Sequence, residues 1–412
     1  SFNPKEQIIT ITVKDGEVTK DITLKAEDLY DITVVETMGS FTAQINAIKT
    51  VVDPDNSEIT YDIGKIVKLI VPTGITGIST DVIKNATVLE EIVLADGANV
   101  TFATKSISNC TALKLIMLGD CTVVFSTDTI EGDTADLTID ATKANATVLT
   151  KAFINKSKLR HFYMGTGKSY SFAASCFEKA GLDEFIVPDY TASFSAEYGM
   201  FFQPPNLKYA YIGRGITTID NIFDQCNHLQ TLVLMDVTTI TGEYFACRAW
   251  SGDDVLRIYH HADTLNLKKG NFLYESYGVI LYTNAMGFDS TPARMNGEVT
   301  KTVNGVQVTY PAYTIVKGIP HEYKEGNIDA TCTTMGSTGY TTDCPCGIVE
   351  NATYTTYKAV SPSTQVNGTT AIAGEIVIGT TTDALGHEFD TEKGATVVGT
   401  TEPTCINNAT TT

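Results

Sequence analysis

A short hydrophobic phrase returns again and again between Ile66 and Tyr282, and this regularity constrains the fold more than any other feature of the chain. Its core is L-x-x-I-x-L, and the clearest copies are KNATVLEEIVL (84–94), SNCTALKLIML (108–118), INKSKLRHFYM (154–164), KAGLDEFIV (179–187), PPNLKYAYI (204–212) and QCNHLQTLVL (225–234). One such unit cannot bury its apolar side until neighbouring units stack on it. The pattern therefore predicts a solenoid.

The spacing of the copies narrows the type of solenoid. A weak copy near Thr134 (TADLTI) fills the one long gap, and the others begin at Ile66, Leu89, Leu113, Leu159, Leu182, Leu207, Leu229, Val255 and Tyr277. The resulting steps of 21 to 26 residues are typical of leucine-rich repeats, in which each unit supplies a short strand and a returning turn.

The half-repeat that precedes each strand also recurs. It reads ITGISTDVIKNATVL (75–89), VTFATKSISNCTAL (100–113), TVLTKAFINKSKL (147–159) and ITTIDNIFDQCNHL (216–229). This phrase resembles the BspA-like leucine-rich-repeat family of cell-surface proteins, over about residues 59–287. The resemblance implies a leucine-rich-repeat solenoid, either α/β or mainly β with short helical turns. Segments 121–146 and 236–264 depart from the phrase, so we expect irregular stacking there.

Both flanks of the solenoid have a different pattern. Residues 1–58 alternate apolar and polar side chains in IITITV (8–13), DITLKA (21–26) and YDITVV (30–35), which predicts half-buried strands forming a cap or an accessory β-region. Residues 288–320 contain TVNGVQV (302–308), whose Asn304-Gly305 pair predicts a hairpin that caps or links the far end. Residues 321–412 are expected to form a small β-rich, Thr-rich module that contains cysteines.

That C-terminal stretch repeats a phrase of its own. Residues 320–347 and 384–405 both begin with His-Glu-aromatic and contain a Thr-Cys pair. They resemble the repeats containing His and Cys that follow repeat domains in bacterial surface proteins. The family's cysteine pair is altered here, because Thr342 stands where the first cysteine is expected and the thiols are Cys344 and Cys346.

The cysteines fall into two groups by location. Cys110, Cys176, Cys226 and Cys247 lie in the half-repeats, where free cysteine acts as a small buried hydrophobe. Four others lie in polar, Thr-rich sequence, where a C-x-C pair favours disulfides over a zinc site. These disulfide candidates are Cys332, Cys344, Cys346 and Cys405, and their connectivity stays open.

Eight asparagines occur in N-x-S/T sequences, at Asn85, Asn99, Asn109, Asn145, Asn155, Asn351, Asn367 and Asn408. Two interpretations are open for them. They are turn residues, whose side chains satisfy nearby backbone groups, or they carry glycans on the rim of the solenoid if the source glycosylates its exported proteins.

Charge and hydropathy limit the partners. The formal net charge of −19 opposes nucleic acid and anionic membranes, because their phosphates would repel the chain. Apolar runs such as IVKLIVP (66–72) have the length of strands, so we expect no direct membrane insertion. The sequence starts at Ser1, without a leader, which suits a mature exported product or a trimmed chain. We expect an extracellular or cell-surface location.

No enzyme signature is complete. GTGKS (165–169) ends like a phosphate-binding loop, but Phe162 occupies the position of its first glycine, so a turn is expected. His260 and His261 are adjacent on an expected strand and would point to opposite faces, which opposes a shared metal. We therefore expect no catalysis, no cofactor and no metal.

What remains is the outer face of the expected sheet. Strand side chains alternate, so the positions flanking the central Ile point outward, and they are unusually apolar. We expect one contiguous band there that binds a ligand, made of His161, Tyr163, Tyr209, Tyr211, Arg257 and Tyr259. Two other interpretations stay open: a flanking module covers the face, or its composition reflects ordinary strand propensity.

Together these features predict a secreted or surface-attached protein that binds or adheres to host or neighbouring-cell proteins or glycans. The alternative is an extracellular structural protein that assembles with itself into a coat or filament.

Overall fold

A computed structural model describes residues 3–38, 40–242, 256–267, 279–283, 285, 298–303, 305–311 and 313–317, and the strands within 323–382. The chain divides into two compact units, Ser1–Ile319 and Pro320–Thr412. In the second unit, one antiparallel sheet contains β32 (Tyr323–Ile328), β33 (Gly336–Thr342), β37 (Ile376–Thr382) and β34 (Thr355–Tyr357). A short pair, β35 (Gln365–Val366) and β36 (Thr369–Thr370), completes its described strands.

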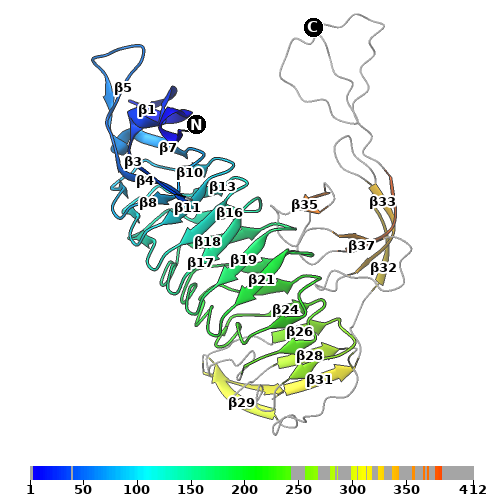
Figure 1. Ribbon diagram of the computed structural model, residues 1–412. Coiled ribbons are helices and arrows are strands. Elements are labelled where there is room, and N and C mark those ends of the chain that lie inside the picture. Colours follow the sequence, from blue (N-terminus) through cyan, green and yellow to red (C-terminus); the bar gives the residue numbers. More distant parts are fainter. Residues whose placement is uncertain are drawn as a thin grey trace, which may run out of the picture. The chain divides into compact units, whose positions relative to one another are not determined.

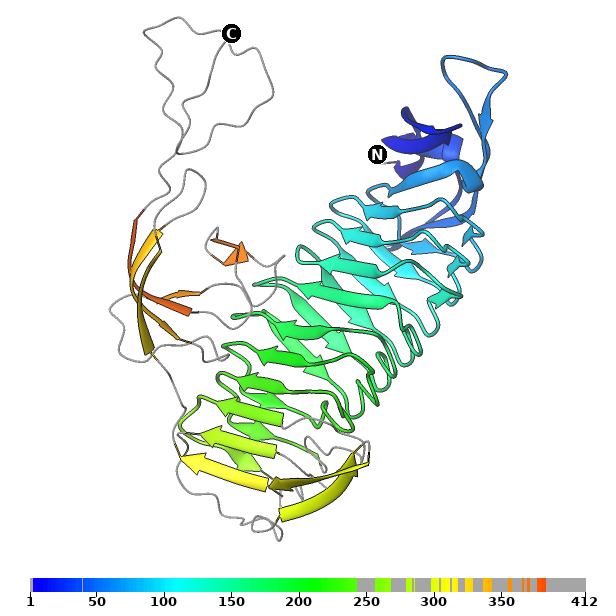
Figure 2. The same ribbon diagram turned by 180° about the vertical axis from the view of Figure 1, so that it is seen from behind.

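The first unit is a mainly β solenoid of about eight turns (Figures 1 and 2). The first side of the solenoid consists of two sheets, and within each sheet the solenoid strands pair in parallel with their neighbours. These strands are β7 (Ile66–Val71), β10 (Glu91–Leu94), β13 (Leu115–Leu118), β16 (Leu137–Ala141) and β18 (Leu159–Met164), and, in a second sheet, β20 (Glu184–Val187), β22 (Tyr209–Ile212), β24 (Thr231–Leu234), β26 (Leu256–His260), β28 (Val279–Thr283) and β31 (Tyr313–Lys317).

The half-repeats supply the other sides. The second side contains β8 (Gly77–Ile78), β11 (Asn99–Phe102), β14 (Thr122–Phe125), β17 (Asn145–Val148), β19 (Ser169–Phe172) and β21 (Ser193–Ala196). A narrow third side contains β9 (Ile83–Lys84), β12 (Ile107–Ser108) and β15 (Ile130–Glu131). In later turns a separate three-stranded sheet contains β23 (Thr218–Ile219), β25 (Thr239–Ile240) and β27 (Asn266–Leu267).

The predicted helical turns are nearly absent. In the described residues the one α-helix is α1 (Ala26–Leu29), and it lies before the solenoid. The predicted period is confirmed on the first side, because Glu91 pairs with Lys68 and Leu115. Two copies lie elsewhere than predicted: β16 starts at Leu137 rather than near Thr134, and the copy predicted to start at Tyr277 lies one residue later, because Arg257 pairs with Ile280.

Segment 121–146, which was expected to stack irregularly, stacks more regularly than predicted. Through 121–146 the strands keep their register, apart from one shift between Leu137 and Thr138. Part of 236–264, including Cys247, lies outside the described residues. At the far end the predicted hairpin forms from β29 (Glu298–Val303) and β30 (Val306–Pro311). The solenoid sheet then continues past residue 287, since β31 pairs in parallel with β28.

Two hairpins close the N-terminal end. β1 (Ile8–Asp15) and β2 (Val18–Lys25) extend the first side through β7. β3 (Tyr30–Thr37) and β4 (Ser40–Ile48) extend the second side through β8. Short elements complete the cap: η1 (Pro4–Glu6), β5 (Val51–Val52), β6 (Thr60–Tyr61) and η2 (Ile63–Lys65). The first strand of the solenoid therefore has a partner on both sides, as a capping element requires.

Inside the solenoid, phenylalanines from successive turns stack into a column that we call the phenylalanine spine. Its members are fully buried, and neighbouring rings lie 5.1 to 5.9 Å apart. The spine consists of Phe102, Phe125, Phe153, Phe177, Phe201 and Phe223. Four of the five neighbouring pairs are stacked and Phe125–Phe153 is tilted, and aromatic contacts at such distances add to the free energy gained by burying each ring.

An ionic cluster connects β2 of the N-terminal cap to the segment that contains β5 and β6. The Lys20 ammonium contacts Asp53 at 2.9 Å and Asp55 at 2.7 Å, and the Tyr61 hydroxyl donates to Asp53 at 2.8 Å. The hydrogen bond from Lys20, followed by those from the Asp55 backbone and Tyr61, lowers the pKa of Asp53 to about 2. Asp53 is 4% exposed, so its charge depends on these partners.

Replacing Asp53 by Asn is expected to lower the thermal unfolding temperature at pH 7. A carboxylate whose pKa falls on folding contributes stability fully above its unfolded pKa, near 3.8, and loses that contribution as pH falls through about 2. The difference between D53N and the native chain should therefore shrink towards pH 2. Calorimetry from pH 2 to pH 7 checks this, with the exposed Asp55→Asn as the milder control. An equal difference at both ends of the range would refute the role of the charge.

Candidate binding surface

The first side presents two columns of side chains to the outside. Ile92 and Leu94 of β10 point into the core, which leaves Glu91 and Val93 pointing outward. Parallel pairing aligns the equivalent residues of successive strands, as predicted: Leu115 and Met117, His161 and Tyr163, Glu184 and Ile186, Tyr209 and Tyr211, Thr231 and Val233, Arg257 and Tyr259. We call these two columns the aromatic face.

Three further pairs belong to this face and were not predicted. Lys68 and Ile70 precede the first clear copy of the phrase, and Thr138 and Asp140 belong to the weak copy. Ile280 and Tyr282 belong to the copy that lies one residue later than predicted. The alternation of strand residues identifies each pair once the register is fixed.

Four of the six predicted band residues keep exposed surface. Arg257 is exposed, and His161, Tyr163 and Tyr209 are half-buried. The rings of His161 and Tyr163 lie two residues apart on β18 and stack with their centroids 5.2 Å apart. A stacked pair of this kind is rigid, which suits a surface that loses little conformational entropy on binding.

The prediction that the whole band is exposed is wrong at two positions. Tyr211 is 7% exposed, and its hydroxyl turns to the edge of the sheet and donates to Asp189 at 2.8 Å. Tyr259 is 5% exposed and stacks on Tyr282, with the ring centroids 5.2 Å apart. Strands only about 4.8 Å apart bring aligned aromatic rings into contact, so neighbouring side chains cover them. Val233, aligned between Tyr211 and Tyr259, is fully buried.

The band is also not one continuous ladder. β18 is the last strand of one sheet and β20 is the first strand of the next, so the ladder of backbone hydrogen bonds is interrupted between them. An ion pair between Arg160 and Asp183 spans this interruption. The band is therefore divided into a β18 part, His161 and Tyr163, and a part on β22 and β26.

Burial favours the uncharged forms of His161 and Tyr209 on this face. Desolvation lowers the pKa of His161 and raises the pKa of Tyr209 well above its ordinary range. The His161 Nδ1 atom is buried without a hydrogen-bond partner. From β18 to β26 the face therefore offers rings and apolar side chains, with the exposed Arg257 as a cation, and the charged Lys68 and Glu91 pair with each other nearer the N-terminal end.

The adjacent histidines have separate surroundings. His260 is fully buried, with Nδ1 2.7 Å from the Thr283 hydroxyl and Nε2 2.6 Å from the Val237 carbonyl oxygen. Both ring nitrogens are thus used in holding three turns together, while His261 lies just beyond the strand. Within the part of the chain that the structure describes, no group of three or more potential metal ligands is arranged to hold an ion.

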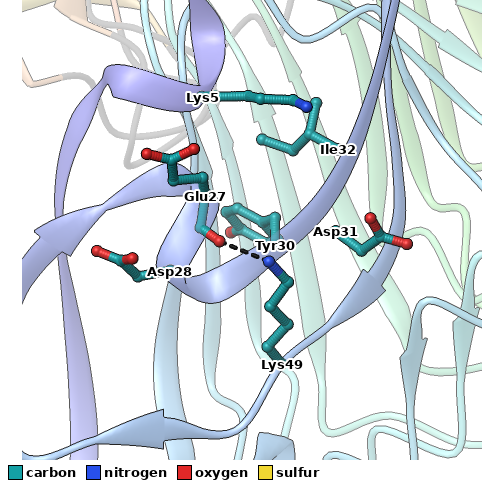
Figure 3. A pocket seen from close by; sticks show the side chains of 7 residues that line it. All are labelled: Lys5, Glu27, Asp28, Tyr30, Asp31, Ile32 and Lys49. Carbon is teal, nitrogen blue, oxygen red and sulfur yellow. Dashed lines mark hydrogen bonds between the residues drawn. The ribbon is translucent and has the colours of Figure 1, made fainter.

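A pocket of about 310 Å³ lies in the N-terminal cap (Figure 3). It is lined by Lys5, Glu27, Asp28, Tyr30, Asp31, Ile32 and Lys49. The Lys49 ammonium donates to the Glu27 carbonyl oxygen at 2.7 Å, and the Tyr30 hydroxyl donates to the Ile70 carbonyl oxygen at 2.6 Å. Its carboxylates are mixed with ammonium groups and its tyrosine is already bonded, so the pocket shows no arrangement for catalysis.

The GTGKS segment forms the tight turn between β18 and β19, as predicted, and is not followed by a helix. Among the described residues, no helix is long and apolar enough to cross a membrane.

Five of the eight asparagines lie in described residues, and they differ in availability. Asn85, Asn99, Asn109 and Asn155 are exposed, and all but Asn99 adopt left-handed backbone at a turn. Asn145 is half-buried, and its side-chain oxygen accepts the Ser169 N–H at 2.8 Å. Asn351, Asn367 and Asn408 lie outside the described residues.

The described cysteines are all buried free thiols: Cys110, Cys121, Cys176 and Cys226. Burial raises the pKa of Cys110 and of Cys121 to about 11, and raises the pKa of Cys176 well above its ordinary value. Cys121 was not among the predicted buried thiols. The disulfide candidates Cys332, Cys344, Cys346 and Cys405 lie outside the described residues.

We expect these four buried thiols to resist labelling by iodoacetamide at pH 8 in the native protein, because the thiolate is the reacting form and burial disfavours it. All four should be labelled in urea. Mass spectrometry of labelled peptides gives the occupancy at each cysteine and reports on the C-terminal candidates in the same run. Rapid native labelling of Cys176 would contradict the buried position.

Comparisons with protein-family models, with curated proteins and with solved structures returned no match.

Proposed function

We propose that this chain is a secreted or cell-surface protein that binds a host or neighbouring-cell protein through the aromatic face, without catalysis. The observation that carries the proposal is the alignment of partly exposed His161, Tyr163, Tyr209 and Arg257 with aliphatic residues of the same columns. Tyr and Arg are the residues that concentrate binding energy in protein interfaces, and a rigid sheet holds them in place.

We also propose that the solenoid is of the BspA-like leucine-rich-repeat type. The L-x-x-I-x-L phrase and the half-repeat before it support this assignment, and the mainly β turns with almost no helix are compatible with it. The resemblance implies an exported surface protein.

Self-assembly into a coat or filament is the alternative, and one observation opposes it at the N-terminal end. The free edge strand β2 carries Lys20, Asp21 and Lys25, and charged residues on an edge discourage pairing with another chain. Analytical ultracentrifugation and electron microscopy of the pure protein distinguish the two functions. Monomers support binding, and sheets or fibres support assembly.

The binding proposal is tested on a panel of immobilised extracellular-matrix proteins and mucins by biolayer interferometry. Tyr163→Ala and Arg257→Glu remove exposed groups from the two parts of the face, whereas Thr111→Glu places a charge on an exposed turn away from it. We expect Tyr163→Ala to weaken binding about tenfold or more, the effect of a central interface residue. Unchanged binding by both face variants, or no binding to the panel, contradicts the proposal.

A further inference from the structure

The second side carries a different kind of surface. Inward positions of its strands hold core residues such as Phe102 and Phe125, so the alternate positions face outward. Pairing aligns them into one column of eight rows and one of five. The first is Thr33, Gln44, Gly77, Thr101, Val124, Thr147, Ser171 and Ser195; the second is Asn99, Thr122, Asn145, Ser169 and Ser193. We call them the hydroxyl face.

Neither column of the hydroxyl face contains a charged residue. Because 19% of the residues in this chain are charged, two or three charged residues would be expected among the thirteen outward positions. Neither column contains an aromatic residue, and only Val124 has an aliphatic side chain. Almost every position thus supplies a neutral hydroxyl or amide group.

Hydrogen bonds between side chains hold this face in one arrangement. Asn46 donates to the Thr33 hydroxyl at 2.8 Å, and Gln44 donates to the Ser79 hydroxyl at 3.0 Å. At the other end Ser195 donates to Ser171 at 3.1 Å. Gly77 lets the Gln44 amide lie flat across the sheet, because a Cβ there would come within 2.2 Å of the Gln44 side-chain oxygen.

The chemistry of the face excludes most classes of partner. It has no cation for phosphate or nucleic acid, and no cluster of apolar side chains for a lipid surface. Protein interfaces are depleted in serine and rich in aromatic side chains, the opposite of this composition. Groups that both donate and accept hydrogen bonds without charge match a ligand of the same kind, a neutral polyol.

We infer that the hydroxyl face is a docking surface for a neutral, insoluble polysaccharide. Eight strands at about 4.8 Å spacing give a sheet face roughly 34 Å long, with polar side chains on every strand except β8. Such a surface repeats in the same way as a packed array of sugar chains, whose hydroxyls recur at a fixed interval. This binding is separate from the proposed contact with a protein through the aromatic face.

The composition of the hydroxyl face also indicates that its ligand is a large particle rather than a short soluble sugar chain. Small-molecule sites are concave and usually contain aromatic or apolar groups. A flat hydroxyl face offers neither, so each sugar contributes little, and binding requires many contacts made together. We expect retention on polysaccharide particles, and soluble hexasaccharides should compete poorly.

The test measures sedimentation of the full chain with microcrystalline cellulose and with chitin particles. The blocking variant is Thr122→Lys with Ser171→Lys, which places two long charged side chains on the face. The control is Thr87→Lys with Ser157→Lys, which adds the same charge at exposed positions elsewhere. A second variant, Thr101→Val with Thr147→Val, removes two hydroxyls while keeping side-chain volume and strand propensity. Circular dichroism verifies that each variant is folded.

We expect retention on at least one polymer, a loss of tenfold or more in the blocking variant, a smaller loss in the valine variant and none in the control. Tyr163→Ala should leave retention unchanged, which separates this surface from the aromatic face. Absence of retention on both polymers overturns the inference, as does equal loss in the control. Ice-crystal shaping that disappears in the blocking variant also overturns it, because it would assign the face to ordered water.

Discussion

Replacing Phe177 by Ala is expected to lower the free energy of unfolding by roughly 3–5 kcal/mol. Phe177 is fully buried in the middle of the phenylalanine spine, with its ring stacked between Phe153 and Phe201 at 5.7 and 5.9 Å. It also contacts Phe162 of the first side and Phe172 of the second, each at 5.6 Å. The substitution removes a ring from a site whose walls belong to three successive turns and cannot collapse easily.

The position of Phe177 gives the substitution a second consequence. It lies beside the interruption between β18 and β20, which belong to different sheets on the first side, whereas the second side continues from β19 to β21. In a repeat protein each turn is stabilised mainly by its neighbours, so a weakened junction separates the array into two cooperative segments. We therefore expect F177A to broaden the unfolding transition as well as shift it.

Urea unfolding followed by circular dichroism, together with hydrogen exchange resolved by segment, measures both effects. Phe41→Ala is the matched control, since the same side chain is 37% exposed there and belongs to the cap. A loss below about 1 kcal/mol for Phe177→Ala would show that the spine does not carry the stability assigned to it.

The amino-acid sequence is most informative where a residue type repeats because burial demands it. Leu89 and Leu113 occupy equivalent, fully buried positions in successive turns, and the spacing between such leucines is enough to predict the period and the outward columns. Prediction fails where the apolar pattern is weak. The copy around Leu137 has a short phrase with Thr and Asp, so its predicted start lies three residues too early.

The exposure of the aromatic face cannot be predicted from alternation alone. Alternation shows which way Tyr211 and Tyr259 point, but their burial depends on neighbours that come from other turns, such as Asp189 and Tyr282. The interruption beside β18 has no signal in the repeat phrase either. Sequence periodicity indicates the direction of a side chain, whereas its accessibility is a tertiary property.

The hydroxyl face does have a signal in the sequence. The segments NVTF (99–102), NATV (145–148), SYSF (169–172) and SFSA (193–196) alternate polar with apolar residues, and TVVF (122–125) departs from this alternation only at Val124. The leucine-rich-repeat pattern places one strand in each unit, so it assigns these segments to a returning turn. It therefore misses the second strand of each unit. Period-two alternation over four residues predicts that strand, and its outward residues follow directly.

Replacing Gly165 by Ala is expected to cost about 3 kcal/mol, the upper part of the range for added volume in a packed site. Gly165 directly follows β18, where a turn passes over the turn below. A Cβ built on Gly165 would lie 1.8 Å from the Thr142 carbonyl oxygen, far inside van der Waals contact. The obstacle is backbone rather than a flexible side chain, so relief requires the two turns to move apart.

Gly167→Ala, two residues away, provides the control for this effect. Gly167 has φ +73° but nothing within 4 Å of its Cβ position, so alanine there meets only the strain of left-handed backbone, about 1 kcal/mol. The two variants have the same change in composition, and the difference between their urea midpoints isolates the close approach of the turns. If Gly165→Ala is no more destabilising than Gly167→Ala, stacked turns in this solenoid can separate at little cost. The inference that tightly packed turns hold both outer faces in place would then be wrong.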